Sequence, residues 1–285
     1  MKNIVLIPNP VKDVGLRVTE KIVKKLISLG VQPVSWAVPG LEKIDGLRIV
    51  TEEPDSADAV VVIGGDGSVI DASGLAIRLN APLLGVNLGR VGYLTECEPD
   101  NLSQLERLAG GDYEIANRLL LHTELIDACG NVTSSERLAV NDVVISQDGY
   151  FGIANFTVEN SRSECVKYRG NGVIVATPIG STAYSLSAGG PIISHGLDSI
   201  TVTPVCPHSF FNRSIIFEPG EVITICNTGD LALNISIDGR SFATLNTDER
   251  CRIYQSSHKL KMITFTTNNM FTALFDKIRA LENNV

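Results

Sequence analysis

The chain has 285 residues, 44% of them hydrophobic and 20% charged, which is typical of a soluble globular protein large enough for two domains. A formal net charge of −8 argues against broad nucleic-acid binding, because that function favours a basic surface. No apolar run approaches the roughly 20 residues that span a bilayer. The short apolar stretch at the N-terminus predicts a strand rather than a signal peptide, so we expect a cytoplasmic protein that contacts no membrane.

The first part of the chain alternates between strand patterns and helix patterns. Strands are predicted at residues 4–8, 31–38, 59–63 and 82–86, and helices at 16–29, about 69–79 and 100–108. Asp100 is the expected N-cap of the third helix, and Gly110 and Gly111 are expected to end it. This alternation predicts an open, mostly parallel, Rossmann-like α/β sheet.

The pattern changes near residue 119. Strand-like runs follow at 121–128, 139–146, 154–158, 173–177, 221–226, 231–237, 250–254 and 262–265, with little helix between them. They predict a β-rich, sandwich-like second domain. The apolar residues of the tail recur at helical spacing and predict a terminal helix, which we expect to pack on the first domain. The predicted parts are therefore an α/β domain (1–118), a β-rich domain (119–265) and a C-terminal helix (266–285).

The cysteines and histidines do not indicate a metal site. The six cysteines form no C-x-x-C pair, and the four histidines form no H-E-x-x-H pattern. We expect reduced thiols and no structural zinc.

A glycine-rich loop follows the third predicted strand, at Gly64-Gly65-Asp66-Gly67-Ser68. A strand, a glycine turn and a helix in this order bring backbone N–H groups together where anions bind. Because a carboxylate repels phosphate, Asp66 is expected to face a hydroxyl or a metal ion. The alternative is a plain turn in which Asp66 or Ser68 caps the helix. No G-x-x-x-x-G-K-[ST] run exists, and Ile70 replaces the third glycine of a dinucleotide fingerprint.

The β-rich part carries three polar segments that sheet packing does not require. Residues 180–191 contain four hydroxyl side chains and one tyrosine, which suit hydrogen bonding and stacking on a base, although a Ser/Gly surface loop is the plainer interpretation. Asn141-Asp142 interrupts an apolar run, either as a bulge at a sheet edge or as a pair that binds a diol. Arg169-Gly170-Asn171-Gly172 taken alone predicts a hairpin turn.

Taken together and in order, these segments resemble the NAD kinase family. The matching motifs are the loop 64–67, the run 85–95, Asn141-Asp142, the segment 169–172, the run 177–191, Pro207-His208-Ser209 and Asn212-Arg213. The Gly-Gly-Asp-Gly motif also occurs in lipid kinases and phosphofructokinases, whereas the Thr-Pro-x-Gly-Ser-Thr-Ala-Tyr run is highly specific. The resemblance spans most of the chain.

The resemblance implies a reaction and a site between the two domains. The terminal phosphoryl group of ATP, or of polyphosphate, would pass with Mg²⁺ to the 2′-hydroxyl of the adenosine ribose of NAD, giving NADP. Asp66 would be the catalytic base, and no protein residue is assigned as a metal ligand. The phosphate loop would comprise Gly64, Gly65, Gly67 and Ser68. The NAD-binding residues would be Gly67, Asn141, Asp142, Arg169, Asn171, Thr182, Ala183, Tyr184, Ser187, Cys206 and Arg240. Members of the family assemble as homodimers or homotetramers through the β-rich domain.

Three positions depart from the family pattern. Asn171 stands where aspartate is usual, Arg240 where glutamine is common, and Ser68 where threonine or asparagine is more frequent. The first two bear on the nicotinamide part of the ligand and therefore on substrate preference. Two alternative functions remain open: another kinase of the superfamily that acts on a lipid or a sugar phosphate, and a catalytically weak NAD-binding regulator.

Overall fold

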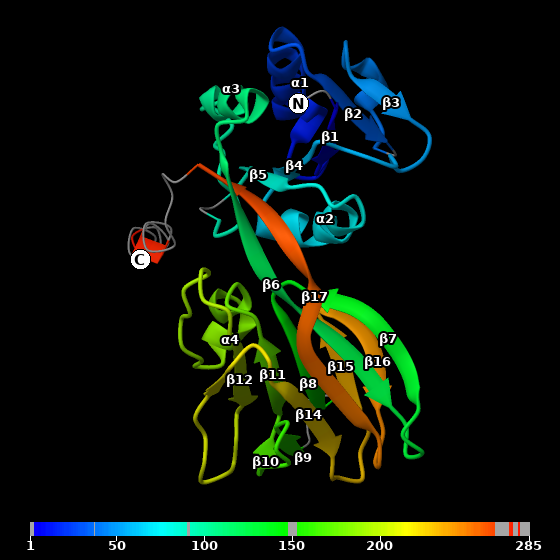
Figure 1. Ribbon diagram of the computed structural model, residues 1–285, viewed down its shortest axis with the longest axis vertical. Coiled ribbons are helices and arrows are strands. Elements are labelled where there is room, and N and C mark those ends of the chain that lie inside the picture. The colour runs from blue at the N-terminus through cyan, green and yellow to red at the C-terminus, as the bar shows by residue number, and fades with distance from the viewer. Residues whose placement is uncertain are drawn as a thin grey trace. The chain divides into compact units, whose positions relative to one another are not determined.

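The computed structural model describes residues 3–36, 38–89, 92–147, 153–265, 274–275 and 279. The chain divides into two compact units. Unit 1 comprises Met1–Asn117 and Leu260–Val285, and unit 2 comprises Arg118–Lys259. Their helices and strands are labelled in Figure 1. No helix within the described ranges is long and apolar enough to cross a membrane.

Unit 1 is built on a parallel sheet with the strand order β5-β4-β1-β2-β3. The strands are β1 (Asn3–Pro8), β2 (Gln32–Trp36), β3 (Arg48–Val50), β4 (Ala59–Gly64) and β5 (Leu83–Asn87). The helices are α1 (Arg17–Ser28), α2 (Asp66–Arg78) and α3 (Ser103–Gly110), with the short 3₁₀ helices η1 (Val14–Leu16) and η2 (Leu41–Lys43). All six residues of β4 are buried, as the uninterrupted apolar run predicts for a central parallel strand.

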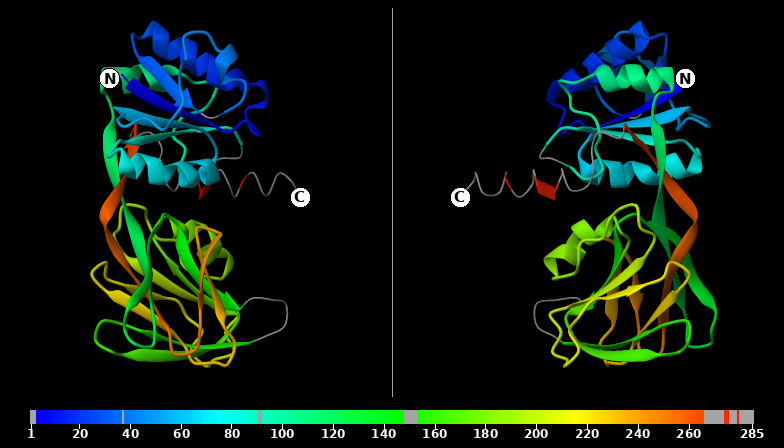
Figure 2. Two further views of the ribbon diagram at one scale, coloured as in Figure 1. Left: turned by 90° about the vertical axis from the view of Figure 1, so that its right-hand side faces the viewer. Right: turned by 60° about the vertical axis from the view of Figure 1, so that its left-hand side comes forward.

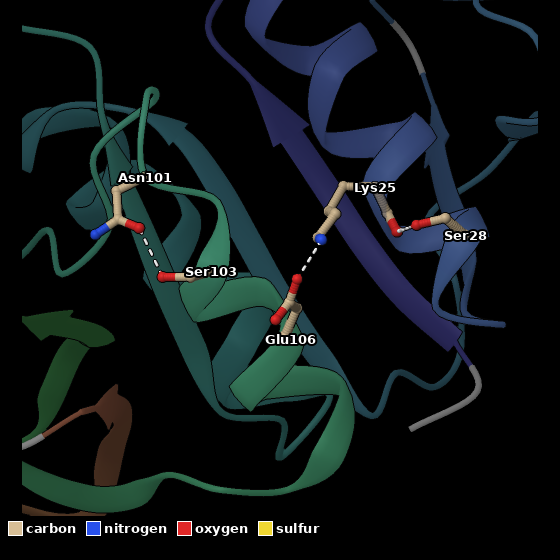
Figure 3. Close-up of polar contacts among 5 residues, drawn as sticks. All are labelled: Lys25, Ser28, Asn101, Ser103 and Glu106. Carbon is tan, nitrogen blue, oxygen red and sulfur yellow. Dashed lines mark hydrogen bonds and ion pairs between the residues drawn. The ribbon is translucent and has the colours of Figure 1, made fainter.

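Helices cover both faces of this sheet. In Figure 2, α1 (dark blue) and α3 (green) lie on one side and α2 (cyan) lies on the other. The apolar residues of α1 and α3 share one core with alternate residues of β1 and β4. Lys25 of α1 also forms an ion pair with Glu106 of α3 (Figure 3). The α/β architecture predicted for this part of the chain is confirmed.

The start of α3 differs from the prediction. The helix begins at Ser103 rather than after Asp100, and no side chain caps it. Ser103 Oγ donates instead to Asn101 Oδ1 at 2.6 Å (Figure 3). The predicted end is correct, because Gly111 adopts a φ of 77° in the left-handed region that glycine tolerates.

Unit 2 contains two sheets. One is antiparallel, with the order β13-β12-β11-β8-β15-β16, and is called sheet B here. Its strands are β8 (Asp142–Gln147), β11 (Gly172–Ala176), β12 (Ile200–Val205), β13 (Ile215–Phe217), β15 (Leu233–Ile237) and β16 (Arg240–Leu245). The other contains β6 (Glu114–Ile126), β7 (Val132–Ala139), β9 (Ala154–Glu159), β10 (Cys165–Gly170), β14 (Val222–Asn227) and β17 (Arg250–Thr264). Apolar residues of both sheets form a common core, so the predicted β-rich, sandwich-like architecture is confirmed.

Several details of the β-rich part were predicted incorrectly. The strands predicted at 250–254 and 262–265 are one strand, β17, which pairs with β14 and at its end with β5. Residues 180–187 form the 3₁₀ helix η3 (Gly180–Thr182) and the short helix α4 (Tyr184–Ser187) rather than a loop. The predicted terminal helix lies outside the described residues apart from Leu274, Phe275 and Arg279.

Candidate active site

The glycine loop of unit 1 joins β4 to α2. Gly64 is the last residue of β4, Gly65 is the N-cap of α2, and Asp66 is its first residue. No side chain caps this helix, so the alternative that Asp66 or Ser68 serves as its cap is wrong. Ser68 Oγ instead accepts a hydrogen bond of 2.9 Å from Asn9 Nδ2. The first N–H groups of a helix have no partner within it, so an uncapped first turn suits an anion.

Asp66 is held by the backbone of a second loop. Its Oδ2 accepts a hydrogen bond from the N–H of Tyr93, and its Oδ1 accepts one from the N–H of Leu94, each at 3.0 Å. Gly92 lies so close that a Cβ there would overlap Asp66 Oδ1. The half-buried carboxylate is thus oriented by main-chain donors. Burial and the charge of Asp66 together raise the pKa of Tyr93.

The glycine loop contains a single carboxylate, that of Asp66. Within the described ranges, no group of three or more His, Cys, Asp or Glu residues could hold a metal ion. Mg²⁺ commonly binds through one or two carboxylates together with substrate phosphates and water. Asp66 is the carboxylate of the glycine loop that could supply such a ligand.

The segment after β1, for which the sequence predicts no role in the site, lies against the glycine loop. Asn9 follows β1, and its N–H donates to Ile63 O of β4 at 2.8 Å. Lys12 Nζ lies close to Gly65, where a Cβ would stand 2.6 Å from it. The sequence shows a turn at Asn9-Pro10. It does not show that this turn lies beside the end of β4, because β1 and β4 are 51 or more residues apart.

In unit 2, the Asn141-Asp142 pair lies where the chain crosses from β7 to β8, that is, from one sheet to the other. Of the two predicted alternatives, the bulge at a sheet edge is wrong, because β8 is flanked by a strand on each side. The carboxylate of Asp238 accepts hydrogen bonds from the N–H groups of Val140, Asn141 and Asp142 at 2.9, 2.7 and 3.2 Å. Asp238 therefore fixes the backbone of this crossing. This role was not predicted from the sequence.

The crossing also contacts the highly specific run of residues 177–191. Thr177 donates its N–H to Asn141 O at 2.9 Å and its hydroxyl to Val140 O at 2.6 Å. A Cβ at Gly180 would overlap Asn141 O, so the close approach requires glycine. The run and the Asn141-Asp142 pair therefore belong to one cluster, at the end of sheet B where Asp142 pairs with Ala176.

Two carboxylates in this cluster have perturbed acidity. Asp142 is 4% exposed, and burial together with the nearby charge of Asp238 raises its pKa to about 7. Burial also raises the pKa of Asp238, although its three N–H donors and Arg240 act in the opposite direction. Arg240 follows the two-residue turn Asp238-Gly239, whose φ values of 48° and 75° match a hairpin turn of type I′.

The hydroxyl groups around α4 divide into inward and outward sets. Ser181 and Ser185 are fully buried, and Ser185 Oγ lies 3.1 Å from Thr203 Oγ1. Tyr184, by contrast, is 46% exposed, and Ser187 is also exposed. Helix α4 packs against β11, and Ala188, which follows the helix, packs on the cluster of Val144, Ile174 and Ala176 in sheet B. Thr182 and Ala183, which precede α4, are half-buried, and the Thr182 hydroxyl donates to Ile179 O at 3.0 Å.

Arg169, Asn171 and Cys206 form a separate cluster. The predicted hairpin at residues 169–172 is wrong, because β10 and β11 belong to different sheets and this segment crosses between them. Asn171 donates its N–H to Val205 O at 2.9 Å, and Arg169 donates its N–H to Ser209 Oγ at 3.0 Å. Cys206 is exposed and has a φ of 44°, which is uncommon for a residue other than glycine.

The two clusters of unit 2 lie at opposite ends of β8 and β11. Asp142 pairs with Ala176 at one end, and Ser146 pairs with Gly172 at the other. At about 3.4 Å per residue, these ends are separated by about 14 Å. Arg240 belongs to the end that contains Asp142, because its partner Ile237 pairs with Val143. The structure therefore places Asn171 and Arg240 apart.

Comparison with known proteins identifies relatives over the whole chain. The family model "ATP-NAD kinase N-terminal domain" matches residues 21–113, and "ATP-NAD kinase C-terminal domain" matches residues 140–265. The chain is 34% identical to an NAD kinase of Caldanaerobacter subterraneus subsp. tengcongensis over 284 residues, covering 98% of this chain and 99% of the relative. It is 36% identical to an NAD kinase of Geobacter sulfurreducens over 234 residues, covering 81% and 82%.

Solved structures share the fold. Yeast NADH kinase in complex with NADH superposes with a TM-score of 0.84 at 22% identity, covering 96% of this chain and 86% of that one. An NAD kinase from Archaeoglobus fulgidus in complex with ATP gives a TM-score of 0.71 at 22% identity, covering 98% and 99%.

Proposed function

The chain belongs to the NAD kinase family, and from this premise we propose that it transfers the terminal phosphoryl group of ATP to the 2′-hydroxyl of the adenosine ribose of NAD. The proposal rests on one observation: two backbone N–H groups orient the Asp66 carboxylate at the uncapped start of α2. Polyphosphate is the alternative donor. In this assignment the α/β domain (1–118) supplies the phosphate loop, and the β-rich domain (119–265) binds NAD.

Asp66 acts on the attacking hydroxyl. The N–H groups of Tyr93 and Leu94 orient its carboxylate, which would accept the proton of the ribose hydroxyl. As the ribose oxygen bonds to the γ-phosphorus, the bond from that phosphorus to the leaving ADP oxygen breaks. Positioning contributes most in such a loose transition state.

The glycine loop is the proposed binding site for the donor phosphates. Gly64, Gly65 and Gly67 keep side chains away from the backbone N–H groups at the start of α2, and the half-buried Ser68 is held by Asn9. Mg²⁺ bound with the donor would neutralise charge on the phosphate oxygens. This arrangement accounts for phosphate binding without a lysine inside the loop.

The Asn141-Asp142 pair and the residues around the start of α4 are the proposed contacts of NAD in unit 2. Asn141 and Asp142 would bind ribose hydroxyls, and Tyr184 would stack on a base. Thr182, Ala183 and Ser187 adjoin Tyr184 along the chain and would line the dinucleotide. Ser181 and Ser185 are left out of this selection, because both side chains are fully buried.

We further propose that the enzyme is a homo-oligomer that brings together clusters from two copies. The cluster of Arg169, Asn171 and Cys206 lies about 14 Å along sheet B from Asp142, by strand length. Mixing an Asp142→Ala protein with an Asn171→Ala protein tests this. Activity of the mixture above that of either variant alone would support a shared site, and no gain after subunit exchange would contradict it.

The function itself is tested by product formation. Purified protein is incubated with NAD, Mg²⁺ and either ATP or polyphosphate, and NADP is measured with an NADP-specific dehydrogenase. NADP is expected, and NAD lacking the 2′-hydroxyl should give none. Phosphorylation of a lipid or sugar phosphate in place of NAD would favour the superfamily alternative. Tight NAD binding without turnover would favour a regulator.

A further inference from the structure

Lys12 lies in a segment whose backbone is fixed from both sides. Asn9 Oδ1 accepts the N–H groups of Val11 and Lys12 at 3.1 and 3.2 Å, and Asn9 O accepts the N–H of Asp13 at 2.8 Å. The carboxylate of Asp13 in turn accepts the N–H of Thr19 at 2.8 Å, at the start of α1. The Cα of Lys12 is therefore held in place relative to β1 and α1, although its side chain is exposed.

The ammonium group of Lys12 lies beside two glycines from different loops. An ideal Cβ at Gly65 would stand 2.6 Å from Lys12 Nζ, and one at Gly89 would stand 3.9 Å from it. Gly65 precedes α2, and Gly89 follows β5. The absence of side chains at both positions leaves the ammonium group next to the main chain of the phosphate loop.

Lys12 also differs in its pairing from other lysines of unit 1. Lys21, Lys24 and Lys25 form ion pairs with carboxylates. Across the described part of the chain, Lys12 has no such partner, and Asp66 is instead engaged by backbone N–H groups. An unpaired cation above a phosphate loop is available to an anionic ligand.

We propose that Lys12 binds the β- and γ-phosphate oxygens of the donor on the glycine loop and stabilises their charge during transfer. The inference rests on the proposed function of that loop as the donor site. The glycine loop Gly64–Ser68 contains no lysine. In this proposal Lys12, from the segment after β1, supplies the positive charge. Charge on the transferred group and leaving phosphate is what a positioned cation stabilises in phosphoryl transfer.

The test compares Lys12→Met, which keeps the stem and removes the charge, with Lys12→Arg, which keeps the charge. Lys43→Met is the matched control, because Lys43 is also exposed in unit 1 and lies on η2. Lys12→Met should weaken binding of Mg-ATP and of Mg-tripolyphosphate by about 10- to 100-fold, the range for a hydrogen bond to a charged group. Affinity for AMP and for NAD, and the melting temperature, should stay unchanged. Lys12→Arg should restore much of the lost affinity.

Two results would overturn the inference. One is ATP and tripolyphosphate affinities for Lys12→Met within twofold of the wild type. The other is an equal loss of AMP affinity, which would place Lys12 away from the β- and γ-phosphates. Because these are binding measurements, they decide the role of Lys12 even if the wild type makes no NADP, a result that would count against the proposed function alone.

Discussion

The glycine loop of unit 1 and the Asn141-Asp142 cluster of unit 2 are built in different ways. The loop takes its residues from one continuous stretch, 64–68, at the end of a buried parallel strand. The cluster is assembled from residues near 141, 177–180 and 238, which meet because the chain crosses between two sheets. A local motif can thus be recognised from spacing alone, whereas the second arrangement depends on long-range hydrogen bonds.

The carboxylates of the two regions also differ in their environment. Asp66 is half-buried, and two backbone N–H groups orient its carboxylate. Asp142 is almost fully buried beside Asp238, and its pKa is raised to about 7. We therefore expect the loop to govern turnover and the cluster to govern NAD affinity and pH-dependent stability.

The largest effect is expected at Asp66. Asp66→Asn keeps the size of the side chain and removes the base, so kcat should fall about 10²–10⁴-fold, the usual contribution of a general base. Steady-state assays of NADP formation, with Asp45→Asn as an exposed control in the same unit, measure this. Recovery of kcat at high Mg²⁺ would instead identify Asp66 as a metal ligand, and a near-normal kcat would exclude a catalytic role.

A smaller effect, on stability, is expected at Asp142. The folded protein keeps the Asp142 proton up to a pKa of about 7, whereas the ordinary value is 3.8. The native state therefore binds more protons between these values, and the free energy of unfolding should fall as the pH rises through this window, by about 4 kcal/mol at most. Asp142→Asn should flatten this fall in urea titrations performed from pH 4 to 8. An unchanged slope would contradict the raised pKa.

At Tyr184 the expected effect is on binding. Base stacking on an aromatic ring contributes roughly 1–3 kcal/mol, so Tyr184→Ala should raise the Kd for NAD about tenfold or more. Tyr184→Phe keeps the ring and should bind NAD nearly as well as the wild type. Calorimetry measures both constants, and equal affinity for Tyr184→Ala and wild type would exclude stacking.

The smallest effect is expected at Asn171. Asparagine offers hydrogen bonds without the negative charge that aspartate would place near a cationic nicotinamide ring. The wild type should therefore discriminate weakly between NAD⁺ and NADH, and Asn171→Asp should shift kcat/KM toward NAD⁺. Identical kcat/KM ratios for the two proteins would show that this position does not sense the charge of the ring.

The same comparison explains how much the sequence could predict. The buried strand, glycine turn and helix around residues 59–79 follow from apolar runs and glycine placement, and the structure confirms them. The sequence could not show that Tyr93 and Leu94 hold Asp66, because backbone donors leave no residue-specific signal. The Asp238-Gly239 pair is a recognisable turn signal, but its hydrogen bonds to residues 140–142 depend on sheet pairing.

Errors in unit 2 have a common physical cause. The segment 169–172 was predicted as a hairpin turn and the Asn141-Asp142 pair as an edge bulge or a diol-binding pair, yet both lie where the chain passes from one sheet to the other. Composition indicates where a strand ends but not which strand comes next. For the same reason, the sequence did not reveal that Asn171 and Asp142 lie at opposite ends of sheet B.

The division between a loop that performs chemistry and a sheet that binds NAD is tested most directly by the NAD affinity of Asp66→Asn. Isothermal titration calorimetry of this variant is performed in the absence of a phosphate donor. The Kd for NAD should lie within about twofold of the wild type, while NADP formation is nearly lost. This is expected because a base acts in the transition state rather than in ground-state binding. A loss of NAD affinity as large as the loss of turnover would contradict that division.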